Sequence, residues 1–164
     1  MVAIRKSFEE GHRRKFLVVV DETAEADRAI VYAAKRAERT SGIATLLYVI
    51  APGDFQHWLG VEDIMRAEAR ENAENCLAKA ADRVRSVART DPELVVREGN
   101  RSDEILALIE EDADIAILVL AAGSGSEGPG PLVSAIAGKG AASFPIPVTI
   151  VPATLDDESI AALA

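Results

Sequence analysis

The feature that most constrains this chain is an alternation of short apolar runs with longer, charged segments. The apolar runs are rich in β-branched residues and cover residues 16–20, 43–50, 94–96, 115–120 and 147–151. Such unbroken runs are typical of strands that are buried on both faces. In the segments between the runs, apolar residues recur at helical spacing. The sequence therefore predicts an α/β fold, in which right-handed crossovers join a parallel sheet covered by helices on both faces.

Local signals place the helix ends within this pattern. Asp21 or Thr23 is expected to cap the first helix, because side chains of this kind accept hydrogen bonds from free N–H groups. The longest helix is predicted over residues 61–87, and Asn100 or Ser102 is expected to begin the next one.

The length of 164 residues is that of one domain with a core of its own. We expect a leader over residues 1–14, the α/β domain over 15–152, and a tail over 153–164 that forms at most a loose helical turn. No apolar stretch reaches membrane-spanning length, and the first residues lack the apolar block of a signal peptide. A cytoplasmic protein without a membrane partner is therefore expected.

The charge and the rare residue types exclude several function classes. A formal net charge of −9 argues against nucleic acid as a partner, because phosphate backbones require clustered Lys and Arg. The single cysteine, Cys76, cannot form an internal disulfide and is expected to be a buried structural thiol. His12 and His57 have no second metal ligand at a recognisable spacing, and neither lies near a candidate nucleophile. We therefore expect no metal site, no catalytic residues and no enzymatic activity.

Glycines concentrate in one segment, residues 123–140 with the sequence GSGSEGPGPLVSAIAGKG. It holds six of the eleven glycines and follows the apolar run that ends at Ala122. A glycine-rich loop at the end of a buried strand lets backbone N–H groups approach an anion closely. The segment therefore predicts a binding site for a nucleotide phosphate.

Three known spacings can be compared with this segment. GSGSEG at 123–128 fits G-x-G-x-x-G, but it follows the fourth strand and lacks the acidic residue expected about twenty positions later. GKG at 138–140 lacks the first glycine and the hydroxyl residue of a Walker A loop. A third spacing fits better, in which Gly125 is followed by Gly128 and then by Gly138.

That third spacing, together with four other segments, resembles the universal stress protein family. VVVDETAEADRAIVYAAKRA is similar to the family's opening strand and Ala-rich helix, and TLLYVIAP is similar to its second strand. VREG at 96–99 and PIPVTIVP at 145–152 resemble the segment after the third strand and the last strand. The resemblance covers roughly residues 15–152. It implies a five-stranded parallel sheet in the order 3-2-1-4-5 and a homodimer formed through the last strand.

The resemblance also implies a ligand, ATP or AMP, where strands one and four diverge, with Mg²⁺ only if ATP is bound. The residues that it carries over are Asp21, Val49, Gly123, Ser124, Gly125, Gly128, Gly138 and Lys139. In this assignment Asp21 faces the adenosine, and the backbone of Val49 contacts adenine. In the loop that Gly123 opens, the amides of Gly125 and Gly128 surround the ribose and phosphate. Gly138 with Lys139 holds the outer phosphates.

The chain departs from the family pattern at several positions. Glu22 stands where the family usually has Gly, and the segment from Gly138 to the last strand is about one helical turn short. A second register is open, in which Ala121 takes the first glycine position and Ser134 supplies the hydroxyl.

Two side chains have alternative interpretations. Lys139 stands where nucleotide binders usually have Ser or Thr, and is either a phosphate ligand or a solvated lysine. Trp58, with Phe55, either closes over the ligand, forms a partner surface or packs against the edge of the sheet.

The sequence as a whole predicts an adenine-nucleotide-binding stress-response protein, homodimeric and without catalysis, in which bound nucleotide changes the dimer or partner surfaces. Two alternatives stay open. One is a nucleotide-free interaction module of the same fold, in which the shortened GKG segment marks a lost phosphate site. The other is a slow ATP hydrolase.

Overall fold

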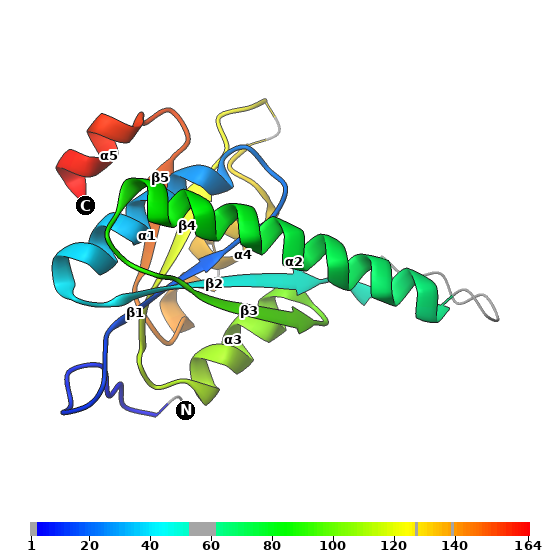
Figure 1. The fold of residues 1–164 in the computed structure, drawn as a ribbon, viewed down its shortest axis with the longest axis horizontal. Coiled ribbons are helices and arrows are strands. Elements are labelled where there is room, and N and C mark those ends of the chain that lie inside the picture. Colours follow the sequence, from blue (N-terminus) through cyan, green and yellow to red (C-terminus); the bar gives the residue numbers. More distant parts are fainter. Residues whose placement is uncertain (1–2, 53–61, 127, 139) are drawn as a thin grey trace.

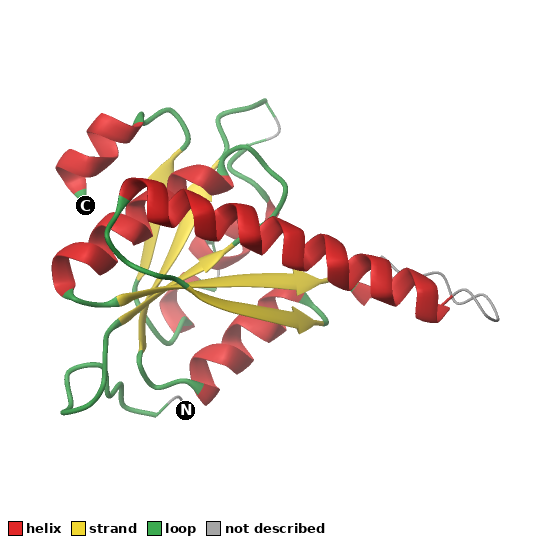
Figure 2. Cartoon of the chain, viewed as in Figure 1, coloured by secondary structure: helices red, strands yellow, loops and turns green. Residues whose placement is uncertain are grey.

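In the computed structural model, a central parallel β-sheet is covered by helices on both faces (Figures 1 and 2). The structure describes residues 3–52, 62–126, 128–138 and 140–164. The strands are β1 (Lys15–Val19), β2 (Ile43–Ile50), β3 (Glu93–Glu98), β4 (Ile115–Ala122) and β5 (Val148–Pro152). The helices are α1 (Ala26–Thr40), α2 (Glu62–Val87), α3 (Arg101–Glu111), α4 (Pro131–Ala137) and α5 (Asp157–Leu163), with a 3₁₀ turn at Ala141–Ser143. The strand order is β3-β2-β1-β4-β5, which confirms the predicted fold class.

Strand β1 is the central strand, and it pairs in parallel with β2 on one side and with β4 on the other. Phe16, Leu17 and Val18 have no exposed surface. An unbroken apolar sequence is required here because helices cover both faces of the strand.

Alternate side chains of β1 enter two separate cores. Phe16 and Val18 pack with the buried faces of α1, α2 and α5. Leu17 and Val19 pack with α3 and α4 on the opposite face of the sheet. Figure 1 shows α2 running past the ends of the strands, so its amino-terminal part extends beyond the sheet. Among the described residues, no helix is both long and apolar enough to cross a membrane.

The helix starts follow the sequence prediction at α3 but not at α1. The Asn100 side chain accepts a hydrogen bond from the Asp103 N–H at 3.1 Å, which confirms Asn100 as the cap. The expectation that Asp21 or Thr23 caps α1 was wrong, because Glu25 occupies that position without a side-chain hydrogen bond. Asp21 instead closes a local turn, since its Oδ1 accepts the Thr23 N–H at 2.9 Å.

The tail is more ordered than the expected loose turn. It forms α5, in which Ile160 is fully buried and Asp156 accepts the Ser159 N–H at 2.7 Å. Asp157 forms ion pairs with Arg28 of α1 at 2.6 Å and with Arg83 of α2 at 2.8 Å. One apolar anchor and two ion pairs thus fasten this segment to the helical layer. The domain boundaries at 15 and 152 stay a prediction.

Charged contacts also form at the end of the sheet where its strands begin. The Lys15 ammonium lies 3.0 Å from a Glu93 carboxylate oxygen and 2.6 Å from Asp112. Arg5 donates to the carbonyl of Ile109 at 2.7 Å and to that of Asp112 at 3.1 Å, at the carboxyl end of α3. Cations stabilise a helix end of this polarity. These contacts occupy the amino-terminal ends of the strands, so we expect a site at the carboxyl ends.

We predict that Gly42→Ala destabilises the fold by about 2 kcal/mol. An added Cβ would lie 2.5 Å from the Arg14 carbonyl oxygen, and backbone must move to relieve that clash. Chemical denaturation measures the change. Gly125→Ala is the matched control, because a Cβ at Gly125 would meet no atom within 4 Å. Equal stability of the two variants would contradict the close approach at Gly42.

Candidate functional site

The predicted site lies where β1 and β4 end side by side and the chain leaves them in different directions. In an open parallel sheet this reversal of strand order leaves a crevice beyond the carboxyl ends of the strands. Asp21 follows β1 closely, and Gly123 follows β4 directly. The fold thus brings together two segments that are about a hundred residues apart in the chain.

The Asp21 carboxylate is held in place by the turn that it closes. One oxygen, Oδ1, accepts hydrogen bonds from both the N–H and the hydroxyl of Thr23. The other oxygen lies 3.9 Å from the Arg101 guanidinium at the start of α3. A carboxylate with one oxygen committed and one turned toward a cation is oriented before any ligand arrives.

Two cavities occupy the crevice. The first, of about 130 Å³, lies between Asp21, Arg101 and the segment Pro129–Pro131 that leads into α4. The second, of about 530 Å³, is lined by the glycine loop over residues 123–126 and Gly128, and by α1 and the turn before it. Glu25 lines both cavities, so its side chain stands where they adjoin.

Two backbone N–H groups of the glycine loop are engaged within the chain. The Gly123 N–H donates to Pro129 O at 3.1 Å, and the Gly128 N–H donates to Gly125 O at 3.1 Å. Gly128 and Gly130 have φ values of +88° and +109°, a conformation that favours glycine. The loop is therefore shaped by its own hydrogen bonds.

Two of the predicted site residues lie away from these cavities. Gly138 ends α4, and its N–H donates to Ser134 O at 3.2 Å. A Cβ there would lie 2.7 Å from the same oxygen, so this position requires glycine for packing alone. Val49 is 5% exposed and packs with the α3 and α4 core.

The segment beyond Gly138 has little regular structure to position a ligand. Lys139 lies outside the described residues. Of the segment that is short by comparison with the family pattern, the described residues contain the 3₁₀ turn Ala141–Ser143 and no other helix or strand before β5. In the alternative register, Ala121 lines the smaller cavity and Ser134 lies inside α4.

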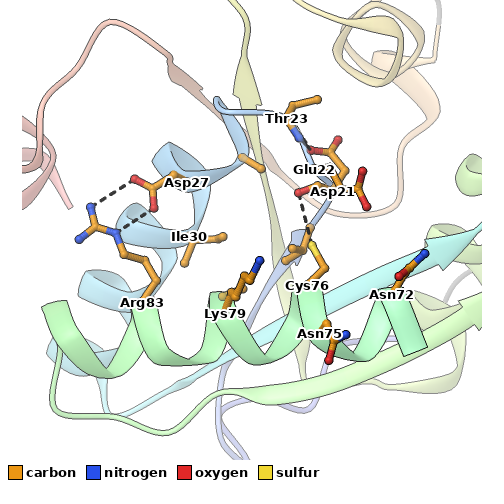
Figure 3. A pocket seen from close by; sticks show the side chains of 13 residues that line it. Asp21, Glu22, Thr23, Asp27, Ile30, Asn72, Asn75, Cys76, Lys79 and Arg83 are labelled. Carbon is orange, nitrogen blue, oxygen red and sulfur yellow. Dashed lines mark hydrogen bonds and ion pairs between the residues drawn. The ribbon is translucent and has the colours of Figure 1, made fainter. Parts of the chain in front are cut away.

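A third and larger cavity, of about 620 Å³, was not predicted from the sequence (Figure 3). It lies between the β1–α1 turn and α2, on the other side of the turn that carries Asp21. Asn72, Cys76 and Lys79 reach it from α2, and Glu22 reaches it from the turn. Phe55, His57 and Trp58 lie outside the described residues.

Cys76 lies half-buried in this third cavity, with its thiol 3.6 Å from the Asp21 carbonyl oxygen. Burial raises the pKa of the thiol, and the carboxylates of Glu22 and Asp21 raise it further. The neutral thiol is therefore favoured, which fits the expected structural role better than that of a nucleophile.

An ion-pair network closes one end of the third cavity. Asp27 accepts hydrogen bonds from Arg83 at 2.8 Å and from Arg28 at 2.5 Å. Partial burial disfavours the charged carboxylate, but these hydrogen bonds outweigh it and hold the pKa of Asp27 below its ordinary value. With Asp157, the four side chains balance two positive charges against two negative ones.

Comparison with known proteins identifies the family. The model of the universal stress protein family matches residues 12–152, which is most of the chain. The chain belongs to the universal stress protein family. No curated protein sequence matches it.

Solved structures of this family share the fold at low sequence identity. Universal stress protein UspA from Lactobacillus plantarum has a TM-score of 0.68 at 18% identity, over 84% of this chain and 97% of that one. The Archaeoglobus fulgidus universal stress protein in complex with dAMP has a TM-score of 0.58 at 18% identity, over 92% of this chain and 99% of that one. A universal stress protein family protein from Arabidopsis thaliana with AMP bound has a TM-score of 0.54 at 14% identity, over 85% of this chain and 91% of that one.

Sequence reasoning missed Glu25, Arg101 and Lys79, all of which line the cavities of this universal stress protein. Each lies on a helix or next to one, with no motif around it. Only the three-dimensional arrangement shows that these charges line cavities.

We predict that Glu22→Gln increases the rate at which iodoacetamide alkylates Cys76 at neutral pH. Removing a carboxylate that raises the pKa of the thiol increases the thiolate fraction, and thiolate is the reactive form. Mass spectrometry over time measures the rate. Glu38→Gln, on the far part of α1, is the matched control and should leave the rate unchanged. A rate unaffected by Glu22→Gln would contradict the placement of Glu22 beside this cavity.

Proposed function

We propose that this protein binds an adenine nucleotide at the carboxyl ends of β1 and β4 and acts through that binding, without catalysis of its own. The observation that carries the proposal is the meeting of the Asp21 turn and the glycine loop across one crevice. The AMP and dAMP complexes of the Arabidopsis and Archaeoglobus relatives support adenine nucleotide as the ligand class.

In the proposed complex, the Asp21 carboxylate accepts hydrogen bonds from the ribose, and the backbone of Val49 contacts adenine. Phosphate lies in the 530 Å³ cavity lined by Gly123, Ser124, Gly125 and Gly128, which we call the groove. Gly138 and Lys139 contact the outer phosphates. Mg²⁺ is part of the proposed complex only if ATP is bound. These roles follow the family resemblance, and the orientation of Asp21 supports the first of them.

Entry of the adenosine part requires the cavity next to Asp21 to open. The cavity next to Asp21 measures about 130 Å³, whereas small-molecule sites usually enclose ~300 Å³ or more. Arg101 and the segment Pro129–Pro131 border it, and are the groups that must move. The same narrowness favours the second candidate function, a nucleotide-free interaction module of this fold.

We predict that AMP in millimolar excess raises the thermal unfolding midpoint, because a ligand that binds only the folded state stabilises it. Gly125→Val should abolish this shift. A side chain at Gly125 projects into open space of the groove, at a position without positive φ, so the ligand-free fold is preserved. Gly128 is less suitable, since its φ of +88° makes any substitution strained.

The control for this experiment is the unfolding midpoint of Gly125→Val without nucleotide, which should match that of the unchanged protein. If no shift occurs with AMP or ATP, and denatured protein releases no nucleotide, the binding proposal is wrong and the interaction module is favoured.

The charges around the groove favour AMP over ATP as the ligand. Glu25 is half-buried against Gly123, with its Oε1 3.1 Å from the position of a Cβ there. Among the described residues it has no cationic partner. Arg28 borders the groove too, but it is committed to Asp27, Asp157 and the Leu155 carbonyl. A carboxylate without a counterion repels each further phosphate that enters.

We predict that Glu25→Gln increases affinity for ATP by about tenfold and for AMP by less, because the removed charge repels the triphosphate more strongly. Calorimetric titration of both nucleotides measures the two changes. Glu22→Gln removes the same charge three residues away, outside the groove, and should leave the ratio of the two affinities unchanged. An equal gain for both nucleotides would contradict a selective role of Glu25.

The proposed homodimer forms through β5. This strand lies at the end of the sheet, where it pairs only with β4 among the described strands. Its Ile150 side chain is 37% exposed. An edge strand with an exposed apolar residue is suited to contact a second copy of the chain.

A further inference from the structure

The 620 Å³ cavity between the β1–α1 turn and α2 is separate from the proposed nucleotide site. The turn of Asp21, Glu22 and Thr23 is the wall between them, because Asp21 and Thr23 line both this cavity and the smaller crevice cavity. The volume lies in the range of small-molecule sites. The cavity therefore has room for a ligand of its own.

Two opposite charges in this cavity have no partner among the described residues. Lys79 and Glu22 form no ion pair or side-chain hydrogen bond there. Arg83, by contrast, is paired with Asp27 and Asp157. Both uncommitted charges lie close enough to Cys76 to act on its pKa in opposite directions, so the thiol lies within reach of both fields.

The rest of the lining offers hydrogen-bonding amides and an apolar surface. Asn72 and Asn75 precede Lys79 along the face of α2 that borders the cavity, and Figure 3 shows Cys76 on α2 between Lys79 and Asn72. On the inner side lie buried carbons of Val20, Ile30 and Ala80. The cavity thus joins one apolar surface to a positive and a negative group.

The charge pattern excludes some ligand classes and favours another. A polyanion such as a nucleotide would meet the carboxylates of Asp21 and Glu22, because Arg83 is already committed to Asp27 and Asp157. A simple organic cation would leave Lys79 without a partner, and a simple anion would leave Glu22 without one. A zwitterion satisfies both groups.

We propose that this cavity binds a small zwitterion of the α-amino-acid type with an apolar side chain. Its carboxylate contacts Lys79, its ammonium faces Glu22, and its side chain covers Ile30 and Ala80. Lys79 on α2 and Glu22 on the turn are exposed to solvent, which screens their charges, so we expect millimolar affinity. This site does not depend on nucleotide binding.

Cys76 provides the test, because it is the only thiol of the chain and lines this cavity. L-leucine is the probe, and the rate of Cys76 alkylation by iodoacetamide is followed by mass spectrometry. The ratio of rates with and without probe is compared within each variant, since Glu22 and Lys79 themselves alter the reactivity of the thiol. We expect L-leucine to slow alkylation severalfold. 4-Methylpentanoate, which lacks the ammonium, and isopentylamine, which lacks the carboxylate, should have little effect.

Lys79→Met and Glu22→Gln should each abolish protection by L-leucine. Lys35→Met, which removes the same charge from an α1 residue outside the cavity, should retain it. Equal protection by 4-methylpentanoate would replace the zwitterion with a simple anion and overturn the proposal. So would loss of protection in Lys35→Met, or absence of protection by L-leucine at its solubility limit.

Discussion

The pairing of β1 with both β2 and β4 is the constraint on which the rest of this structure depends. Because β1 lies in the middle of the sheet, its residues must be apolar on both faces, and Phe16, Leu17 and Val18 are completely buried. After β1 the chain continues to α1 on one face of the sheet, and after β4 it continues to α4 on the other face. The loops that follow the two strands therefore diverge and leave a space between them. The crevice, the Asp21 turn and the glycine loop follow from this divergence.

Much of the fold could be predicted because it depends on local patterns. Unbroken apolar runs fixed the five strands, and Asn100 marked the start of α3 through its hydrogen bond. The strand order came from the family resemblance, since periodicity alone does not order strands. The tail was predicted less well, because the burial of Ile160 and the ion pairs of Asp157 depend on residues far away in the sequence.

The candidate site was predictable to a smaller degree. Glycine spacing and the position after β4 pointed to the carboxyl ends of the strands, where the proposed site lies, and Asp21 lies across the crevice from the loop. The charged residues that line the cavities were not recognisable in the sequence. Glu25 lies beside Gly123 only after α1 packs against β4. Lys79 and Glu22 line one cavity only because α2 packs beside the β1–α1 turn.

The glycine loop also has an energetic consequence for any ligand. Its Gly123 and Gly128 N–H groups already donate to carbonyl oxygens. If the proposed phosphate used these two donors, it would have to replace those bonds, and the net gain from them would be the difference between a charge-assisted and a neutral hydrogen bond. Replacing those bonds would change the shape of the loop, which suits the proposed role of a module that acts through nucleotide binding.

The attachment of α5 has a consequence for the electrostatics of α2. Arg28 and Arg83 share Asp27 and Asp157, so the set is neutral while α5 is docked. If a protease trims the chain before Asp157, or a partner draws α5 away, two guanidinium groups face Asp27 alone. That end of the large cavity then gains a positive charge and attracts anions. The last few residues of the chain thereby set the sign of the field at a surface formed by α1 and α2.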